Sequence, residues 1–106
     1  MKKYNLQNFS KGWFIGNFEP SLFSTDQFEV AVKFYKKGDS ETSHHHKIST
    51  EYTIVNQWRF RMKDMVLEVG DIVLIHPNES TDFECLEDGS TTVVKIPCSK
   101  NDKYID

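Results

Sequence analysis

Residues 38–51, with the sequence GDSETSHHHKISTE, place three consecutive histidines and a carboxylate directly after a segment of strong β-type alternation. Residues two apart on a strand point to the same face, so His44 and His46 are expected to converge while His45 points away. Glu51 follows a four-residue spacer and begins the next β-type run. Two imidazoles and one carboxylate on adjacent strands suit a divalent metal ion, or acid–base chemistry on a small molecule.

Alternation of apolar and polar residues dominates the rest of the chain, and helical periodicity is nearly absent. The pattern predicts strands over residues 28–35, 52–61, 66–69, 72–76, 83–86 and 91–96, with turns at 63–64, 70–71, 77–78 and 87–89. Short strands at this spacing are typical of an all-β barrel or sandwich.

Length and charge narrow the function classes. The chain has 106 residues, the size of one domain, and a net charge of −3 with no basic block. Nucleic-acid binding is therefore disfavoured, and no run approaches the ~20 apolar residues of a membrane helix. We predict no signal peptide and expect a cytoplasmic protein, in which Cys85 and Cys98 are buried free thiols.

The first 27 residues are less regular than the remainder. Trp13, Phe14 and Ile15 are too apolar for a loose tail, so residues 1–27 are expected to pack on the barrel of residues 28–106 or to pair with a partner subunit. This apolar segment favours a homodimer, because one small core cannot easily hide so much aromatic surface.

Two motifs resemble those of the cupin superfamily. Gly38, His44, His46 and Glu51 fit the spacing of the first cupin motif, although Trp58 replaces its closing glycine. In the second motif Gly70-Asp71, an apolar strand and Pro77-Asn78 match, but Thr81 and Asp82 stand where the fourth ligand, a histidine, is expected. The resemblance covers roughly residues 28–97 and is stronger still to small stand-alone cupins.

The resemblance implies a single-domain, all-β cupin fold, a double-stranded β-helix or jelly-roll barrel. It also implies a divalent metal (Zn, Fe, Mn or Ni) on His44, His46 and Glu51, with His76, Thr81 or Asp82 as candidates for a fourth ligand or for the cavity wall. Tyr35, Tyr52, Arg59 and Arg61 are expected on the outer face, and Trp58, Phe60 and Phe83 in the core.

Three function hypotheses remain open. The first is a metal-binding cupin that binds or transforms a small polar metabolite, such as a sugar derivative. The second is a metal-free enzyme similar to the cupin ketoisomerases of sugar nucleotides, in which His44 and His46 would move a proton next to a carbonyl. The third is a non-catalytic module that binds or senses a small molecule, which the altered second motif favours.

Overall fold

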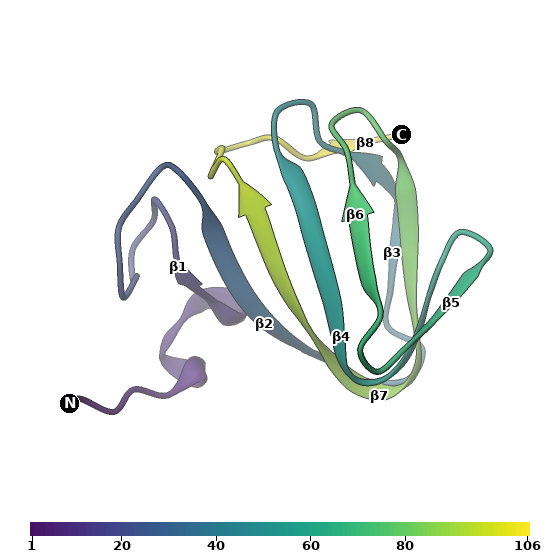
Figure 1. Ribbon diagram of the computed structural model, residues 1–106, viewed down its shortest axis with the longest axis horizontal. Helices are drawn as coiled ribbons and strands as arrows, with labels where there is room; N and C mark the ends of the chain where they lie inside the picture. Colours follow the sequence, from purple (N-terminus) through teal and green to yellow (C-terminus); the bar gives the residue numbers. More distant parts are fainter.

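The computed structural model describes all 106 residues, Met1–Asp106, and contains eight strands and two short 3-10 helices. In chain order they are η1 (Leu6–Asn8), η2 (Ser10–Gly12), β1 (Trp13–Ile15), β2 (Glu29–Tyr35), β3 (Ser40–His45), β4 (Thr50–Met62), β5 (Met65–Glu68), β6 (Ile72–Ile75), β7 (Thr81–Ile96) and β8 (Tyr104–Ile105). The named strands pair in antiparallel fashion within one eight-stranded sheet. The sheet rolls into an open barrel, and the all-β prediction is confirmed (Figure 1).

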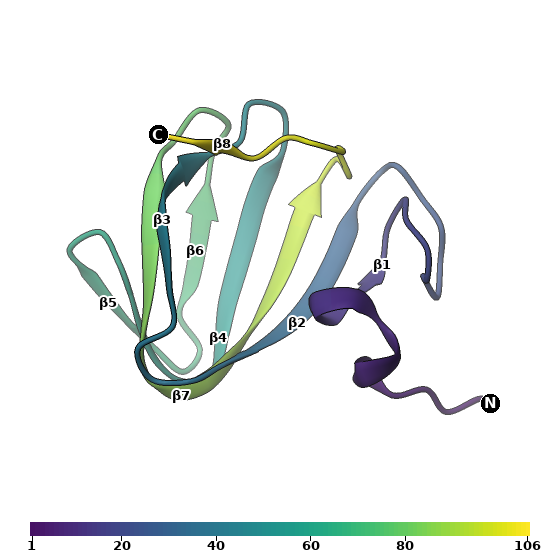
Figure 2. The ribbon, with the colours of Figure 1, turned by 180° about the vertical axis from the view of Figure 1, so that it is seen from behind.

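Two long strands form the middle of this barrel. β4 and β7 pair from Thr50 and Ile96 at one end to Arg61 and Glu84 at the other. β7 pairs in addition with β2 and with β3, while β4 pairs with β5 and β6. Each long strand therefore belongs to both walls of the barrel, and Figure 2 shows both walls from behind.

No helix in the structure is long and apolar enough to cross a membrane.

The prediction of a turn at residues 87–89 is wrong, because β7 continues through these residues as one strand. The facing strand β4 changes register between Val55 and Phe60, and such bulges bend a strand pair without ending it. Gly89 lies at this bend, where an added Cβ would collide with the backbone of Gln57. Gly89 therefore allows the backbones of β4 and β7 to approach closely at the bend, and it does not form the turn expected from the sequence.

One end of the barrel is filled by a compact hydrophobic core. The core consists of Val55, Phe60, Met62, Leu67, Ile75, Phe83 and Cys85. Phe60 and Phe83 stack at a centroid separation of 5.2 Å, and Tyr35 packs against both rings. Truncating a buried Phe of this kind costs about 3–5 kcal/mol. Trp58, in contrast, is 54% exposed, so its predicted core position is wrong.

The other half of the barrel has an unusual distribution of polarity. Neighbouring inward positions on β4 and β7 hold Glu51, Thr53 and Lys95, and the first of these is the cross-strand partner of the last. The outward positions are instead apolar: Tyr52 and its cross-strand partner Leu74 are both exposed. Inward-facing polar and charged side chains around a cavity are typical of a binding site, so we place the candidate site in this half of the barrel.

The N-terminal segment packs against β2 beside this polar interior. β1 pairs with β2 only around Val30 and Ala31. Gly12, at a φ of +83°, lies so close to the carbonyl group of Val32 that no Cβ would fit. This contact holds Trp13 next to the mouth of the barrel.

Candidate functional site

A cavity of about 270 Å³ lies in the polar half of the barrel. Its wall is formed by Lys11, Trp13, Lys33, Tyr35, Glu41, His44, His46, Glu51, Thr53, Met62, Phe83, Thr91, Val93, Lys95 and Lys103. The side chains come from β2, β3, β4 and β7 together with the N- and C-terminal segments. Tyr35 and Phe83 separate the cavity from the hydrophobic core.

The three consecutive histidines divide between two faces, as strand parity predicts. His44 and His46 both line the cavity, with their ring centroids 5.6 Å apart and their planes nearly perpendicular. His45 points outward, where its Nδ1 lies 2.7 Å from a carboxylate oxygen of Asp106 and its ring stacks on Tyr104. Its partners therefore hold His45 away from the cavity.

Hydrogen bonds identify which nitrogen of each cavity histidine carries a proton. Nδ1 of His44 lies 2.9 Å from the carbonyl oxygen of Thr42, which can only accept, so Nδ1 is protonated. Nε2 of His46 lies 3.2 Å from Nζ of Lys95, an ammonium that can only donate. His46 is therefore neutral in this arrangement, with its proton on Nδ1.

The surroundings of His46 favour this neutral form. Burial lowers the pKa of His46, and the positive charge of Lys95 lowers it further, against an opposing effect of Glu51. Glu51 itself accepts a hydrogen bond of 2.8 Å from the hydroxyl group of Thr53. The carboxylate is thus held on the inner face of β4 by its neighbour.

Two lysines enter the cavity without an acidic partner. Lys33 and Lys95 form no ion pair, although Lys95 lies between Glu29 and Glu51 in the sheet register. Both ammonium groups instead face the indole ring of Trp13, at 5.0 Å and 5.2 Å from its centroid. Burial lowers the pKa of Lys33 and raises that of Tyr35.

The loop that places His46 is fixed from the C-terminal segment. Asp102 is 5% exposed, and its carboxylate accepts backbone hydrogen bonds from Lys47, Ile48 and Ser49 at 2.9–3.2 Å. Although burial alone would raise the pKa of Asp102, these three N–H groups hold it below its usual value. No role for Asp102 is evident from the sequence, because only the folded chain brings it to this loop.

The predicted metal ligands share one cavity but are not arranged as a metal centre. No group of three or more His, Cys, Asp or Glu side chains is placed where it could hold one ion. The ammonium of Lys95 stands at the His46 nitrogen that a metal would need, and Thr53 occupies an oxygen of Glu51. The residues as they lie therefore do not fit a metal ion.

None of the candidates for a fourth ligand reaches the cavity. Asp82 points outward, where it pairs with Arg61 at 3.2 Å and accepts the N–H of Lys63 at 2.7 Å. Thr81 is the cross-strand partner of His44, but its hydroxyl donates to a backbone carbonyl. His76 is exposed and shares the outward face of β6. Motif spacing does not specify which face of a strand turns inward, and in this structure His76 and Asp82 lie at outward positions.

Several residues of the cavity wall were missed from the sequence. Tyr35 was expected outside but lies inside, and Lys33 and Lys95 received no role. A signal was present, since Glu29, Ala31, Lys33 and Tyr35 alternate with an apolar set on β2. Alternation alone does not say which set of side chains faces inward, and in this barrel the polar set does.

Of the two cysteines, Cys85 is buried as predicted, whereas Cys98 is only partly buried; both are free.

Comparison with known proteins supports the fold. Neither a scan of protein-family models nor a search of curated protein sequences found a significant match. Among solved structures, KdgF from Halomonas sp. is similar with a TM-score of 0.65 at 18% identity, covering 74% of each chain. An uncharacterised conserved protein with a double-stranded β-helix domain from Klebsiella pneumoniae has a TM-score of 0.66 at 17% identity, covering 92% of this chain and 86% of that one.

A third similar structure is that of a sugar phosphate isomerase from Silicibacter pomeroyi, described as a member of the cupin superfamily. It has a TM-score of 0.61 at 16% identity, and the match covers 66% of this chain and 50% of the isomerase. Identities this low establish a shared fold and no shared chemistry. The chain therefore has the double-stranded β-helix fold of the cupins.

Proposed function

We propose that this protein binds a small organic anion, a carboxylate or a phosphate ester, inside the barrel. The observation that carries the proposal is the pair of cavity lysines, Lys33 and Lys95, that have no acidic partner and share the ring of Trp13. The protein as a whole is acidic, with a net charge of −3, so this cationic site is a local feature.

An anion would relieve the cost of burying these ammonium groups. A charge removed from water is destabilising unless a counter-charge or several hydrogen bonds replace the water. The cavity wall carries four lysines and two glutamates, and a wall with an excess of positive charge attracts ligands of the opposite sign. The volume of about 270 Å³ suits a compact metabolite or the charged end of a larger one.

Proton transfer is the chemistry that the same wall supports. While Lys95 donates to His46, the free lone pair of the imidazole is blocked. An anion that attracts the ammonium would release Nε2, which then lies within the cavity as a base beside His44. The metal-free isomerase hypothesis follows this route, with a proton moved next to a carbonyl of the ligand.

A sugar phosphate carries both features that this route requires. Its phosphate is the anion, and its open-chain carbonyl is the group beside which a proton would move. One of the similar structures described above is a sugar phosphate isomerase. This agreement supports testing sugar phosphates first, alongside simple carboxylates.

Metal binding is the second candidate, and one observation favours it. The Nδ1–H of His44 donates to the carbonyl group of Thr42, an arrangement that leaves Nε2 free and fixes the ring as it is fixed in many metal sites. For this candidate Lys95 must first leave His46. Elemental analysis of untagged protein that has been supplemented with Zn, Fe, Mn or Ni tests metal binding. Protein that contains no metal after supplementation with each of these ions would exclude this candidate.

Calorimetric titration with a panel of small carboxylates and sugar phosphates tests the anion proposal. The wild-type protein should bind at least one member saturably, and Lys95→Met or Lys33→Met should weaken it tenfold or more. Lys47→Met is the matched control, because Lys47 also lies over an aromatic ring, that of Tyr104, but outside the cavity. Binding that Lys47→Met and Lys95→Met reduce equally, or no binding at all, would refute the proposal.

A further inference from the structure

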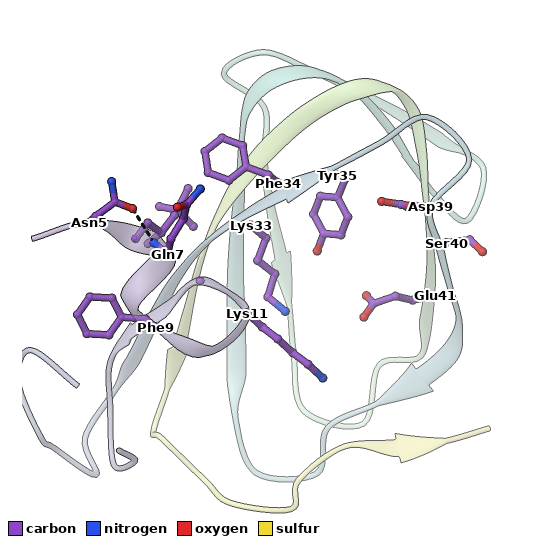
Figure 3. Close-up of a pocket in the computed structure, with 13 residues that line it drawn as sticks. Asn5, Gln7, Phe9, Lys11, Lys33, Phe34, Tyr35, Asp39, Ser40 and Glu41 are labelled. Atoms are coloured by element: carbon purple, nitrogen blue, oxygen red, sulfur yellow. Dashed lines mark hydrogen bonds between the residues drawn. The ribbon is translucent and has the colours of Figure 1, made fainter. Parts of the chain in front are cut away.

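A second hollow, an open groove of about 870 Å³, adjoins the cavity at the edge of β2. Four residues line both spaces: Lys11, Lys33, Tyr35 and Glu41. In Figure 3 these side chains extend into the space enclosed by the strands, while Phe9 and Phe34 stand beside the N-terminal segment. The groove and the cavity therefore form one continuous space with a narrow inner part and a wide outer part.

The groove exists because β2 is only partly covered. β1 pairs with β2 around Val30 and Ala31, and beyond them this edge of β2 has no strand beside it. The 3-10 segments η1 and η2 lie across the gap, and Gly12 fixes their distance from the carbonyl group of Val32. The opening is thus a lateral entrance to the barrel.

The two ends of this space differ in chemistry. The outer part is lined by four apolar side chains, Leu6, Phe9, Val32 and Phe34. The inner part has the ammonium groups of Lys11 and Lys33, and neither forms an ion pair.

The acidic groups of the groove are already occupied. Glu41 pairs with Lys103 at 3.4 Å, and a carboxylate oxygen of Asp39 accepts the backbone N–H of Lys36 at 2.8 Å. Neither Glu41 nor Asp39 forms an ion pair with Lys11 or Lys33, so these two ammonium groups remain open to a ligand.

We infer that the ligand is an amphiphilic carboxylate, with its charged group at Lys33 and its apolar tail in the groove between η1–η2 and β2. The inference rests on the proposed function, since it places the anionic group of the ligand in the barrel cavity. It adds that the rest of the ligand is an apolar chain. A combined space of this size is in the range of pockets that enclose an extended small molecule. Phe34, at 71% exposed, would lose contact with water when the tail binds.

Calorimetry with straight-chain carboxylates from acetate to decanoate, each below its micellar concentration, tests the inference. Affinity should rise about threefold to fourfold for each methylene that the groove buries. Leu6→Ser or Phe9→Ser should flatten this dependence on chain length and leave acetate binding unchanged. Lys33→Met should weaken all members of the series by a similar factor.

Two control variants distinguish the groove from other apolar surfaces. Tyr4→Ser removes an exposed aromatic outside the groove, and Leu74→Ser alters the outer face of the sheet. Neither should change the chain-length dependence, and a loss of that dependence in Leu74→Ser would overturn the inference. Binding of short and long acids with equal affinity would overturn it while leaving the proposed function intact, whereas no binding of any carboxylate or sugar phosphate would refute both.

Discussion

The ammonium of Lys95 lies 3.2 Å from Nε2 of His46 and thereby couples the charged wall of the cavity to its candidate base. Both residues come from positions that face inward in the barrel, Lys95 near the end of β7 and His46 directly after β3. The contact decides what the imidazole can do, because its lone pair is available to a metal or a proton only when Lys95 moves.

Removing this ammonium should change the titration of His46. Burial is the larger cause of its lowered pKa and the charge of Lys95 the next, so Lys95→Met should raise the pKa of His46 while leaving it below the ordinary value. NMR titration of the ring protons measures the change, with Lys47→Met as the control. An unchanged pKa in Lys95→Met would show that the contact is absent in solution.

Asp102 should stabilise the loop after β3 through its charge. Asp102→Asn leaves one acceptor oxygen for three N–H groups, so the free energy of unfolding should fall by about 1–3 kcal/mol near neutral pH. Because the pKa of Asp102 is lower in the folded state, this stabilisation is present above ~3.9, the ordinary aspartate value, and is lost as pH falls through the folded pKa.

Urea unfolding between pH 7 and pH 3 measures the effect of Asp102. The difference between the wild type and Asp102→Asn should shrink over the acidic part of this range. Asp64→Asn, at an exposed turn, is the control and should change stability little. A difference that stays constant across the range would mean that the charge of Asp102 contributes nothing.

Asp82 should be irrelevant to ligand binding. Its partners Arg61 and Lys63 lie on the outer side of the barrel, so Asp82→Asn should leave anion affinity and metal content at wild-type values. An ion pair on the outer surface, screened by solvent, contributes little to stability. Loss of ligand or metal in Asp82→Asn would restore the role suggested by motif spacing.

We expect the chain to form a homodimer through the outer face of the sheet. Ile72, Leu74 and Tyr52 are 65%, 45% and 39% exposed on adjacent strands, and no segment of the chain covers them. The apolar segment Trp13–Ile15, from which a dimer was expected, is a poorer candidate for the interface, because Trp13 lies over the cavity lysines. Sedimentation at micromolar concentration should show a dimer.

Substitutions on this outer face should dissociate the dimer. Leu74→Lys should yield a folded monomer, because burying the new charge in an interface is costly. Ile48→Lys, in an exposed loop after β3, should remain dimeric. A wild-type protein that sediments as a monomer would contradict the expectation.

Local patterns were sufficient to predict half of the strands and the divergence of the histidines. Alternation is a property of a few neighbouring residues, so it located β2, β4, β5 and β6 and separated His45 from His44 and His46. The continuity of β7 was not predictable in this way. It depends on pairing with a bulged β4, a contact between segments far apart in the chain.

The side chains that form the cavity wall could not be predicted from local sequence, because their positions depend on closure of the barrel. A lysine at an alternating strand position faces water in most sheets, so nothing local distinguishes Lys33 and Lys95 from surface residues. Their role follows only when β2 and β7 pair and turn these positions inward, and when Trp13 arrives from the N-terminal segment. Conversely, His76 and Asp82, the candidate ligands expected from motif spacing, lie on the outer side of the barrel, which strand alternation alone does not reveal.

The fluorescence of Trp13 offers the most direct test of the anion site. The chain has two tryptophans, and replacing the exposed one by Trp58→Phe leaves Trp13 as the sole reporter between the cavity lysines. Titrating this variant with a carboxylate or sugar phosphate identified by calorimetry should shift the emission saturably, and adding Lys95→Met should weaken the response at least tenfold. An emission that does not change while calorimetry reports binding would place the anion outside the barrel and contradict the account.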